Sequence, residues 1–271
     1  RMVPSQVARN LILCTFHSLG LHILKQEKEA LGFPQGFTIY DTADQLGVIR
    51  EILKEAHIAD RRLDVKAILF RISRLKNAGV SPQAFLQQVQ LSKFVSEYDG
   101  FAAEVYPRYQ QKMRAFCALD FDDLLLETQK LLETHETISK RWQRRFQHIL
   151  VDEYQDTNVA QYLWLRLLAQ NVEGKTSNIC CVGDDDQSIY RFQGANVENI
   201  EAFRSYYANM LKKVVLKNNY RSIPSVLEAS QHVIRNNKER LSNKDVDFTK
   251  ELQAAHPMRA LLLHPPVLHV Y

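Results

Sequence analysis

The sequence predicts an α/β protein in which a parallel sheet is interrupted by an all-helical insertion. Four short apolar runs typical of buried strands each end in a polar or aromatic cluster, at residues 11–15, 149–151, 179–182 and 214–216. Residues 41–118, by contrast, lose the strand signals and show helical spacing. If the four strands are parallel, their polar ends meet at one edge of the sheet, where open α/β sheets bind ligands.

Composition narrows the class of protein. The 271 residues are 45% hydrophobic and 24% charged, which is typical of a soluble globular protein with room for a core and for two domains. No apolar run approaches the roughly 20 residues of a membrane span, so no membrane partner is expected. The 4 cysteines show no C-x-x-C spacing and there is no H-E-x-x-H, so we expect buried, reduced thiols and no zinc.

Charge is unevenly distributed along the chain, although the net charge is only +4. Residues 151–200 hold 3 Lys and Arg against 8 Asp and Glu, whereas residues 201–271 hold 11 against 6. An acidic segment next to a basic one suits a site that holds a cation and a phosphate, and it supports such a site without identifying it.

The first half of the chain is predicted to be mostly helical. A helix follows the first strand to about Glu29, with Gly32 just past its end. Within the insertion, placed at residues 35–110, helices are expected to begin at Asp41, at Asp64 and at Ser81, where Pro82 takes the first helical position. A fourth helix covers residues 100–116, with a disturbance at Pro107.

After the insertion, residues 119–126 return to the main domain and run into helical segments. Ser222 and Pro224 are predicted to start a helix that ends near Asn236. Residues 260–271 form a possible further strand. Because the chain opens at Arg1 rather than Met, we expect it to start inside a domain.

The strongest single signal is the pair of carboxylates at Asp152 and Glu153. They directly follow the apolar run 149–151, and a helix over residues 159–169 with Asp156 or Thr157 as its N-cap is expected next. One carboxylate can hold Mg²⁺ through oxygen while its neighbour orients or deprotonates a water. Two such charges can also simply solvate the end of a strand. The convergence of four polar strand ends favours a site.

Five segments, in this order, resemble the motifs of the UvrD/Rep/PcrA-type DNA helicases of superfamily 1. They are residues 15–18 (TFHS), 119–124 (LDFDDL), 151–158 (VDEYQDTN), 182–195 (VGDDDQSIYRFQGA) and 219–222 (NYRS). The resemblance implies a RecA-like P-loop NTPase core with an inserted all-helical subdomain. It divides the chain into motor domain 1A at residues 1–34 and 111–221, the helical 1B insertion at 35–110, and the beginning of motor domain 2A at 222–271.

The resemblance also implies which residues bind ATP and Mg²⁺. Asp152, with Glu153 beside it, would bind the metal, and Glu153 would activate the attacking water. Gln187 would sense the γ-phosphate, Arg221 would stabilise its charge, and Tyr220 would stack on the adenine. This division suits phosphoryl transfer, which depends on positioning and charge neutralisation.

On the DNA side, the resemblance implies that Phe16, His17, Tyr190 and Phe192 contact single-stranded DNA. Stacking on aromatic rings suits a motor because every base has a π-face, so that sequence is ignored. The alternative is that Tyr190 and Phe192 have only a structural role, as aromatic residues of the hydrophobic core. The implied partners are single-stranded DNA, junctions of single-stranded and double-stranded DNA, and repair or replication proteins, in the bacterial cytoplasm with the nucleoid.

The phosphate-cradling motif G-x-x-x-x-G-K-[ST] does not occur in the sequence. Gly174, Lys175 and Thr176 resemble its end, but they follow a predicted helix and precede a strand, whereas a phosphate loop has the reverse order. By resemblance, the loop is expected upstream of Thr15. Two other readings stay open: a module that binds single-stranded DNA without turnover, and a metal-dependent nuclease or phosphatase.

We predict that the 271-residue chain by itself does not hydrolyse ATP at a useful rate. The reason is that the Lys and the backbone N–H groups of the phosphate loop hold the β- and γ-phosphates, and the sequence lacks that loop. A phosphate-release assay with and without single-stranded DNA measures this. Robust DNA-stimulated hydrolysis by the purified chain would contradict the prediction.

Overall fold

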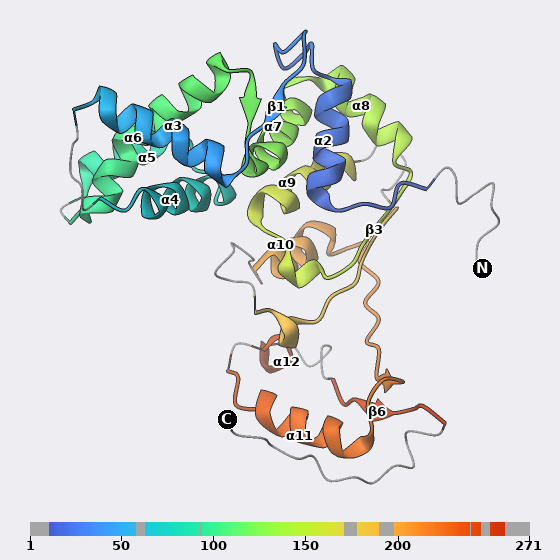
Figure 1. Cartoon of the computed structure of the whole chain (residues 1–271). Helices are drawn as coiled ribbons and strands as arrows, with labels where there is room; N and C mark the ends of the chain where they lie inside the picture. The colour runs from blue at the N-terminus through green and yellow to red at the C-terminus, as the bar shows by residue number, and fades with distance from the viewer. Residues whose placement is uncertain are drawn as a thin grey trace. The chain divides into compact units, whose positions relative to one another are not determined.

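Helices dominate the computed structural model of the chain, and the strands among the described residues form three two-stranded parallel sheets (Figure 1). The structure describes residues 11–57, 63–92, 94–170, 178–189, 198–238, 240–244 and 250–257. Two compact units are present, the first spanning Arg1–Val182 and Tyr190–Asn199 and the second Gly183–Ile189 and Ile200–Tyr271. None of the described helices is long and apolar enough to cross a membrane.

One group of helices in the first unit packs around two buried tryptophans. The group consists of α2 (Phe16–Gln26), α7 (Phe121–Thr134), α8 (Glu136–Arg145) and α9 (Val159–Leu168). Trp142 and Trp164 lie in its core with leucines of α2, α7 and α9. Gly20 lets α2 approach α7 closely, since a Cβ there would lie 2.6 Å from the carbonyl oxygen of Leu124.

A second group of helices covers most of residues 35–110, where the sequence predicts an all-helical insertion. It consists of α3 (Thr42–Glu55), α4 (Val65–Asn77), α5 (Pro82–Leu91) and α6 (Glu97–Ala115), and Figure 1 shows these four gathered on one side of α7. They have their own core, with isoleucines of α3 and α4 against Tyr106 and Tyr109 of α6. Strand β1 (Thr38–Ile39) precedes the group and pairs in parallel with β2 (Ala118–Leu119), which follows it.

The helix starts in this second group are as the sequence predicts. The Asp41 carboxylate accepts hydrogen bonds from the N–H groups of Ala43 and Asp44, and Asp64 and Ser81 cap their helices in the same way. Helix α6 continues through Pro107, so the predicted disturbance does not break it. Helix α2 ends at Gln26, three residues before the predicted end, and Gly32 follows at a left-handed φ of 74°.

Two of the four predicted strands are confirmed, and they are neighbours. Strand β3 (His148–Val151) pairs in parallel with β4 (Asn178–Cys181), with Val151 opposite Cys181. The expectation that β3 is a buried strand is wrong for one of its faces, because Leu150 is 79% exposed while Val151 is buried. The expectation of buried thiols is also wrong, since Cys14, Cys117 and Cys180 are exposed, although all four cysteines are free.

The other two predicted strands are wrong. Residues 11–15 and 214–216 have no strand structure, and Leu13 is 98% and Val214 69% exposed. An apolar run predicts burial, but a strand also needs a neighbour that pairs its N–H and C=O groups. None of the pairings among the described residues includes either run, so the expected single sheet is not seen there. The possible strand at 260–271 lies outside the described residues.

The second unit contains smaller elements. They are η2 (Asp185–Gln187), most of α10 (Glu198–Tyr207), β5 (Asn218–Asn219), α11 (Pro224–Ile234), α12 (Leu241–Lys244) and β6 (Gln253–Ala254). Strand β5 pairs in parallel with β6. The sequence placed a strand in this region but a few residues too early. The predicted helix after it is confirmed as α11, although Ile223 rather than Ser222 is its N-cap.

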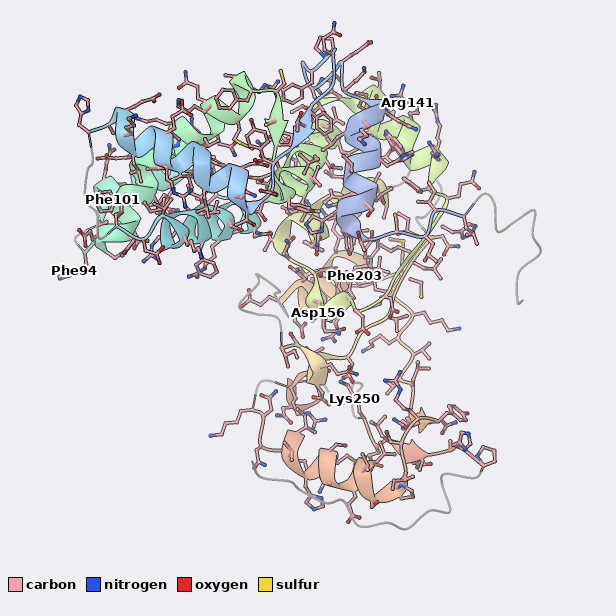
Figure 2. All side chains as sticks on the ribbon, in the orientation of Figure 1. Phe94, Phe101, Arg141, Asp156, Phe203 and Lys250 are labelled. Atoms are coloured by element: carbon pink, nitrogen blue, oxygen red, sulfur yellow. The ribbon has the colours of Figure 1, made fainter. Side chains whose placement is uncertain are left out.

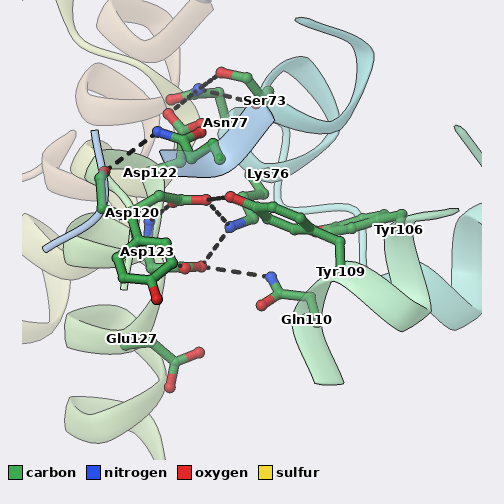
Figure 3. A network of polar contacts seen from close by, with 12 residues as sticks. Ser73, Lys76, Asn77, Tyr106, Tyr109, Gln110, Asp120, Asp122, Asp123 and Glu127 are labelled. Carbon is green, nitrogen blue, oxygen red and sulfur yellow. Dashed lines mark hydrogen bonds and ion pairs between the residues drawn. The ribbon is translucent and has the colours of Figure 1, made fainter. Parts of the chain in front are cut away.

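A buried ammonium group joins the two groups of helices in the first unit (Figure 3). Lys76, at the end of α4, is completely buried, and its Nζ lies 2.6 Å from Asp120 Oδ2 and 2.7 Å from Asp123 Oδ1 at the start of α7. The hydroxyl of Tyr109, on α6, donates a hydrogen bond of 2.9 Å to the same oxygen of Asp120. Three helices therefore meet at one charge cluster.

The pKa values in this cluster reflect burial and opposite charge together. Burial favours neutral Lys76, but the two carboxylates outweigh it and raise the pKa of the lysine. Burial likewise opposes ionisation of Asp120, yet Lys76 holds the pKa of that carboxyl below its usual range. For Asp123 burial wins and raises the pKa to about 6.

We predict that Lys76→Met destabilises the fold by about 3–5 kcal/mol at pH 8, because two buried carboxylates lose their cation. Without the cation, the folded carboxyl groups have pKa values above their unfolded values, so the folded state binds more protons than the unfolded state. The free energy of unfolding of the variant therefore rises as the pH falls from 8 to 5, and the gap to the wild type narrows. Urea unfolding of the chain at both pH values measures this.

Lys112→Met is the matched control for this prediction. Lys112 also lies between two carboxylates, with Nζ 2.7 Å from Glu51 Oε1 and 2.7 Å from Glu55 Oε1, but this cluster is at the surface. Water solvates the charges that this substitution leaves behind, so stability should change little at either pH. If both variants lost the same stability at pH 8, burial of the Lys76 cluster would not be the cause.

Candidate functional site

The paired carboxylates lie where the sequence places them, at the end of β3. Asp152 and Glu153 are both exposed, directly after buried Val151. Asp152 Oδ1 accepts a hydrogen bond of 3.0 Å from the N–H of Glu153. Glu153 itself has a left-handed φ of 50°, which turns the chain from the strand into the short helix η1 (Tyr154–Asp156). Such a conformation is uncommon for a residue with a side chain and is often found at functional sites.

The side chain of Glu153 is held by its own turn. Buried Gln155 donates a hydrogen bond of 2.7 Å from Nε2 to Glu153 Oε2. The other oxygen, Oε1, has no hydrogen-bond partner among the described residues. Glu153 therefore presents one carboxylate oxygen at the surface while the second fixes its orientation.

The residues that follow Glu153 are anchored to their surroundings. The N–H of Tyr154 donates a hydrogen bond of 2.9 Å to the carbonyl oxygen of Val182, just after β4. Within the turn, the hydroxyl of Thr157 bonds the carbonyl oxygen of Tyr154 at 2.7 Å. Asn199, on α10, donates a hydrogen bond of 2.8 Å from Nδ2 to the carbonyl oxygen of Thr157. The turn is thus fixed at both of its ends.

The helix after the turn begins at Val159, as the sequence predicts, but its N-cap is a different residue from the two expected. Neither Asp156 nor Thr157 caps α9; Asn158 does, and it forms a reciprocal capping box with Gln161. Asp156 (Figure 2) is instead part of η1, and its Oδ1 is a buried atom without a hydrogen-bond partner among the described residues. Burial, followed by the charge of Glu153, raises the pKa of Asp156.

In the second unit, the acidic run 184–186 orients Gln187 but is itself paired with cations. Asp184 Oδ2 accepts a hydrogen bond of 2.8 Å from Gln187 Nε2. Lys250 (Figure 2) contacts Asp184 and Asp185, and burial of Asp184 is outweighed by Lys250 and Gln187, so that the pKa of Asp184 is lowered. Asp184 therefore orients Gln187, while Lys250 pairs with two carboxylates of the same run.

Arg240 pairs with Asp186, the third carboxylate of this acidic run. Its Nε and Nη2 donate hydrogen bonds of 2.8 and 2.8 Å to the two carboxylate oxygens of Asp186. Such a two-point contact is the strong geometry for a guanidinium and a carboxylate. The run is therefore part of an ion network within the second unit.

Tyr220 and Arg221 lie on a turn that the side chain of Asn219 holds. Asn219 Oδ1 accepts hydrogen bonds of 2.9 Å from the N–H of Arg221 and 2.7 Å from the N–H of Ser222. Tyr220 is 60% exposed and Arg221 is exposed. The side chain of Asn219, rather than a cap at Ser222, therefore holds the backbone at Arg221.

The aromatic residues assigned to DNA are only partly described. Phe16 begins α2 and packs edge-on against Trp164, with ring centroids 5.7 Å apart. His17 is half-buried beside the exposed ring of Phe121 at 6.1 Å, and burial lowers its pKa although the charge of Asp122 opposes this. Tyr190 and Phe192 lie outside the described residues, as do Gly174, Lys175 and Thr176.

The structure thus places Phe16, His17, Asp152 and Glu153 in the first unit and Gln187, Tyr220 and Arg221 in the second. Sequence reasoning missed the residues that hold these side chains in place, namely Asn77, Gln155, Asn158, Asn199, Asn219, Arg240 and Lys250. Asn219 and Gln155 lie close enough in sequence to be found as local turn contacts. Asn77, Arg240 and Lys250 act across more than fifty residues, and no local pattern marks them.

Adjacent carboxylates at the end of a parallel strand, before a well-capped helix, are typical of α/β domains that bind a metal and a phosphate. Comparison with known families agrees with this class. The family described as "UvrD/REP helicase N-terminal domain" matches residues 1–208, and the chain belongs to this family.

Curated relatives of the chain carry the name ATP-dependent DNA helicase PcrA. The chain is 42% identical to that of Bacillus subtilis (strain 168) over 234 residues, which is 86% of this chain and 30% of the relative. It is 36% identical to that of Leuconostoc citreum over 243 residues, 90% of this chain and 31% of the relative. It is 39% identical to that of Staphylococcus aureus (strain NCTC 8325 / PS 47) over 229 residues, 84% and 30% respectively. The chain therefore spans about a third of the length of these relatives.

We predict that Phe16→Ala lowers the free energy of unfolding by about 2 kcal/mol, because the half-buried ring leaves its contact with Trp164. Phe121→Ala, at the exposed neighbouring ring, is the control and should change stability little. Urea unfolding beside a titration with single-stranded oligonucleotide separates packing from DNA contact. Weaker DNA binding with unchanged stability would show that the ring of Phe16 is free to stack on a base.

Proposed function

We propose that the chain is part of an ATP-dependent DNA helicase, which couples ATP hydrolysis to 3′→5′ translocation on single-stranded DNA and to duplex unwinding in repair or replication. The observation that carries the proposal is the Asp152–Glu153 pair at the end of β3, in a chain that is 42% identical to a helicase over 234 residues. The matched relatives are named for this activity.

The proposed architecture is a RecA-like motor domain at residues 1–34 and 111–221, with the helical 1B subdomain inserted at 35–110 and motor domain 2A beginning at 222–271. The parallel pair β3–β4 supports the motor core. Helices α3–α6 support the insertion, since β1 precedes them and its partner β2 follows them, so that the chain leaves and returns at the same place. The family match over residues 1–208 supports the first motor domain.

The donor atoms at the end of β3 fit Mg²⁺ bound together with ATP. Among the described residues no group of three or more His, Cys, Asp or Glu side chains is arranged to hold a metal ion. Magnesium in nucleotide sites is usually held by one or two carboxylates and the substrate phosphates, which Asp152, exposed and beside Glu153, can supply. Bound there, Mg²⁺ would neutralise charge on the phosphates.

Four side chains of the chain would act on the nucleotide. Glu153, with Oε2 fixed by Gln155, would orient the attacking water and take its proton at Oε1. Gln187, held by Asp184, would contact the γ-phosphate. Arg221 would stabilise charge on the transferring group, and the exposed ring of Tyr220 would stack on the adenine.

Phe16, His17, Tyr190 and Phe192 would contact single-stranded DNA, and junctions of single-stranded and double-stranded DNA would be the substrate. We place the protein in the bacterial cytoplasm with the nucleoid, since the matched relatives are bacterial DNA helicases. Repair or replication proteins are its proposed partners.

The test of this function uses the full-length protein. We expect ATP hydrolysis that single-stranded DNA stimulates, and strand displacement from a duplex with a 3′ tail. Glu153→Gln should abolish both while ATP still binds. DNA binding without hydrolysis would favour a binding module, and metal-dependent cleavage of DNA without nucleotide would favour a nuclease.

We predict that Arg221→Lys in the full-length protein lowers kcat for ATP by about 10²-fold, as lost transition-state donors do. Lysine keeps the charge but loses the planar fork that bridges two phosphate oxygens. Nucleotide affinity and stability should change little. Arg235→Lys, at the other end of α11, is the control. A near-normal kcat for Arg221→Lys would show that Arg221 does not act on the nucleotide, and it would contradict the proposed role of Tyr220 as well.

We predict that Tyr190→Ala or Phe192→Ala weakens binding of single-stranded DNA by about 1–3 kcal/mol for each lost stack, with little change in folding. Core aromatics would instead lose roughly 3–5 kcal/mol of stability. A thermal melt beside a binding titration distinguishes the two. A large drop in Tm with unchanged binding would assign the rings to the core.

A further inference from the structure

The last turn of α4 contacts two other helices at once. Asn77 Nδ2 donates hydrogen bonds of 2.8 Å to Asp122 Oδ1, on α7, and of 2.9 Å to the carbonyl oxygen of Ser73, one turn back (Figure 3). Its Oδ1 accepts a hydrogen bond of 2.6 Å from Nδ2 of Asn158, the N-cap of α9. Both ends of one amide group are therefore used, and they join the inserted helices to the helix that follows the Glu153 turn.

Asn158 also uses both ends of its amide. While Nδ2 donates to Asn77, Oδ1 accepts a hydrogen bond of 2.9 Å from the N–H of Gln161, and Gln161 Oε1 accepts in return from the N–H of Asn158 at 3.0 Å. The residue is 6% exposed, so water offers little replacement for a lost partner. Without Asn77, the buried Nδ2 of Asn158 would lack an acceptor, which favours a shift of Asn158 toward another one.

The cap is connected to the Glu153 carboxylate by a short turn that internal hydrogen bonds hold. The hydroxyl of Thr157, directly before the cap, donates a hydrogen bond of 2.7 Å to the carbonyl oxygen of Tyr154. The N–H of Asp156 donates one of 3.0 Å to the carbonyl oxygen of Glu153. Gln155 then holds the carboxylate of Glu153 itself. A displacement at Asn158 is therefore transmitted to Glu153 through the hydrogen-bonded residues 154–157.

The α4 end of this connection is fixed as well. Lys76, the neighbour of Asn77, is completely buried between Asp120 and Asp123, at 2.6 and 2.7 Å. A buried charge cannot leave such partners without a large cost, so α4 and the start of α7 move as one body. Asn77 is accordingly held in register with α7 when it contacts Asn158.

We propose that Asn77, on the inserted helix α4, is a positioning residue for ATP hydrolysis that sets the Glu153 turn through the cap residue Asn158. This rests on the proposed function, which gives Glu153 its role. Asn77 does not touch the nucleotide or the reacting atoms. It aligns the turn, so its loss lowers the rate of the chemical step and leaves binding of ATP and DNA in place.

The experiment compares Asn77→Ala with the wild type in the full-length protein. We expect kcat of DNA-stimulated hydrolysis to fall about tenfold, the effect of one lost aligning hydrogen bond on a rate. KM for ATP and the Kd for a single-stranded oligonucleotide should stay within about twofold of the wild type. Gln110→Ala is the matched control, because Gln110 contacts Asp123 in the same cluster at 3.4 Å but does not touch Asn158.

Asn158→Ser tests the contact from the other side and keeps α4 and α7 untouched. Serine is a good N-cap and preserves the capping box with Gln161, but it is too short to reach Asn77. We expect the same fall in kcat, and no further fall when both substitutions are combined, since both remove one contact. Fully additive losses, or a normal kcat in both single variants, would overturn the proposal.

Hydrogen exchange separates this proposal from the proposed function. In the absence of nucleotide, the N–H groups of Tyr154 and Asp156 should exchange at least about tenfold faster in Asn77→Ala than in the wild type or in Gln110→Ala. If the wild type does not hydrolyse ATP but exchange accelerates, the positioning holds and the assigned function is wrong. Unchanged exchange at both groups would show that Asn77 does not hold the turn.

Discussion

The buried ammonium of Lys76 is the interaction on which the arrangement of the first unit depends. A completely buried lysine is tolerated only where carboxylates surround it, and Asp120 and Asp123 do so at hydrogen-bond distance. These residues come from α4 and α7, which belong to separate hydrophobic cores. Apolar contacts are not directional, so by themselves they do not set how the two cores are aligned. The ion pairs of Lys76 need defined distances, and they fix that alignment.

That alignment matters because the Glu153 turn leads into α9, whose cap residue Asn158 contacts Asn77 at the end of α4. Glu153 is exposed and adopts a left-handed backbone conformation, so its own packing does little to fix it. Its position comes from a chain of short contacts through Gln155, Thr157 and Asn158 to the end of α4. Buried amides can in this way orient a carboxylate that itself reaches solvent.

Local and long-range structure differ in how far the sequence predicted them. The helix starts at Asp41, Asp64 and Ser81 were predictable because a cap is a contact between residues two or three positions apart. The strands predicted at 11–15 and 214–216 are not formed, since an apolar run does not show whether another segment will pair with it. For the same reason no local pattern predicts the partners of the charged residues at 184–186, because Arg240 and Lys250 lie far along the chain.

The sequence by itself determined the carboxylate pair at Asp152 and Glu153, the strand before it and the helix after it, because hydrophobic periodicity and local hydrogen bonding specify all three. It also contains the motifs that carry the resemblance to the family whose model matches residues 1–208. Only the tertiary structure decided that Asn77 meets Asn158, a contact across 81 positions. Two amides so far apart meet only after α4, α7 and α9 have packed, and no local pattern in the chain encodes that packing.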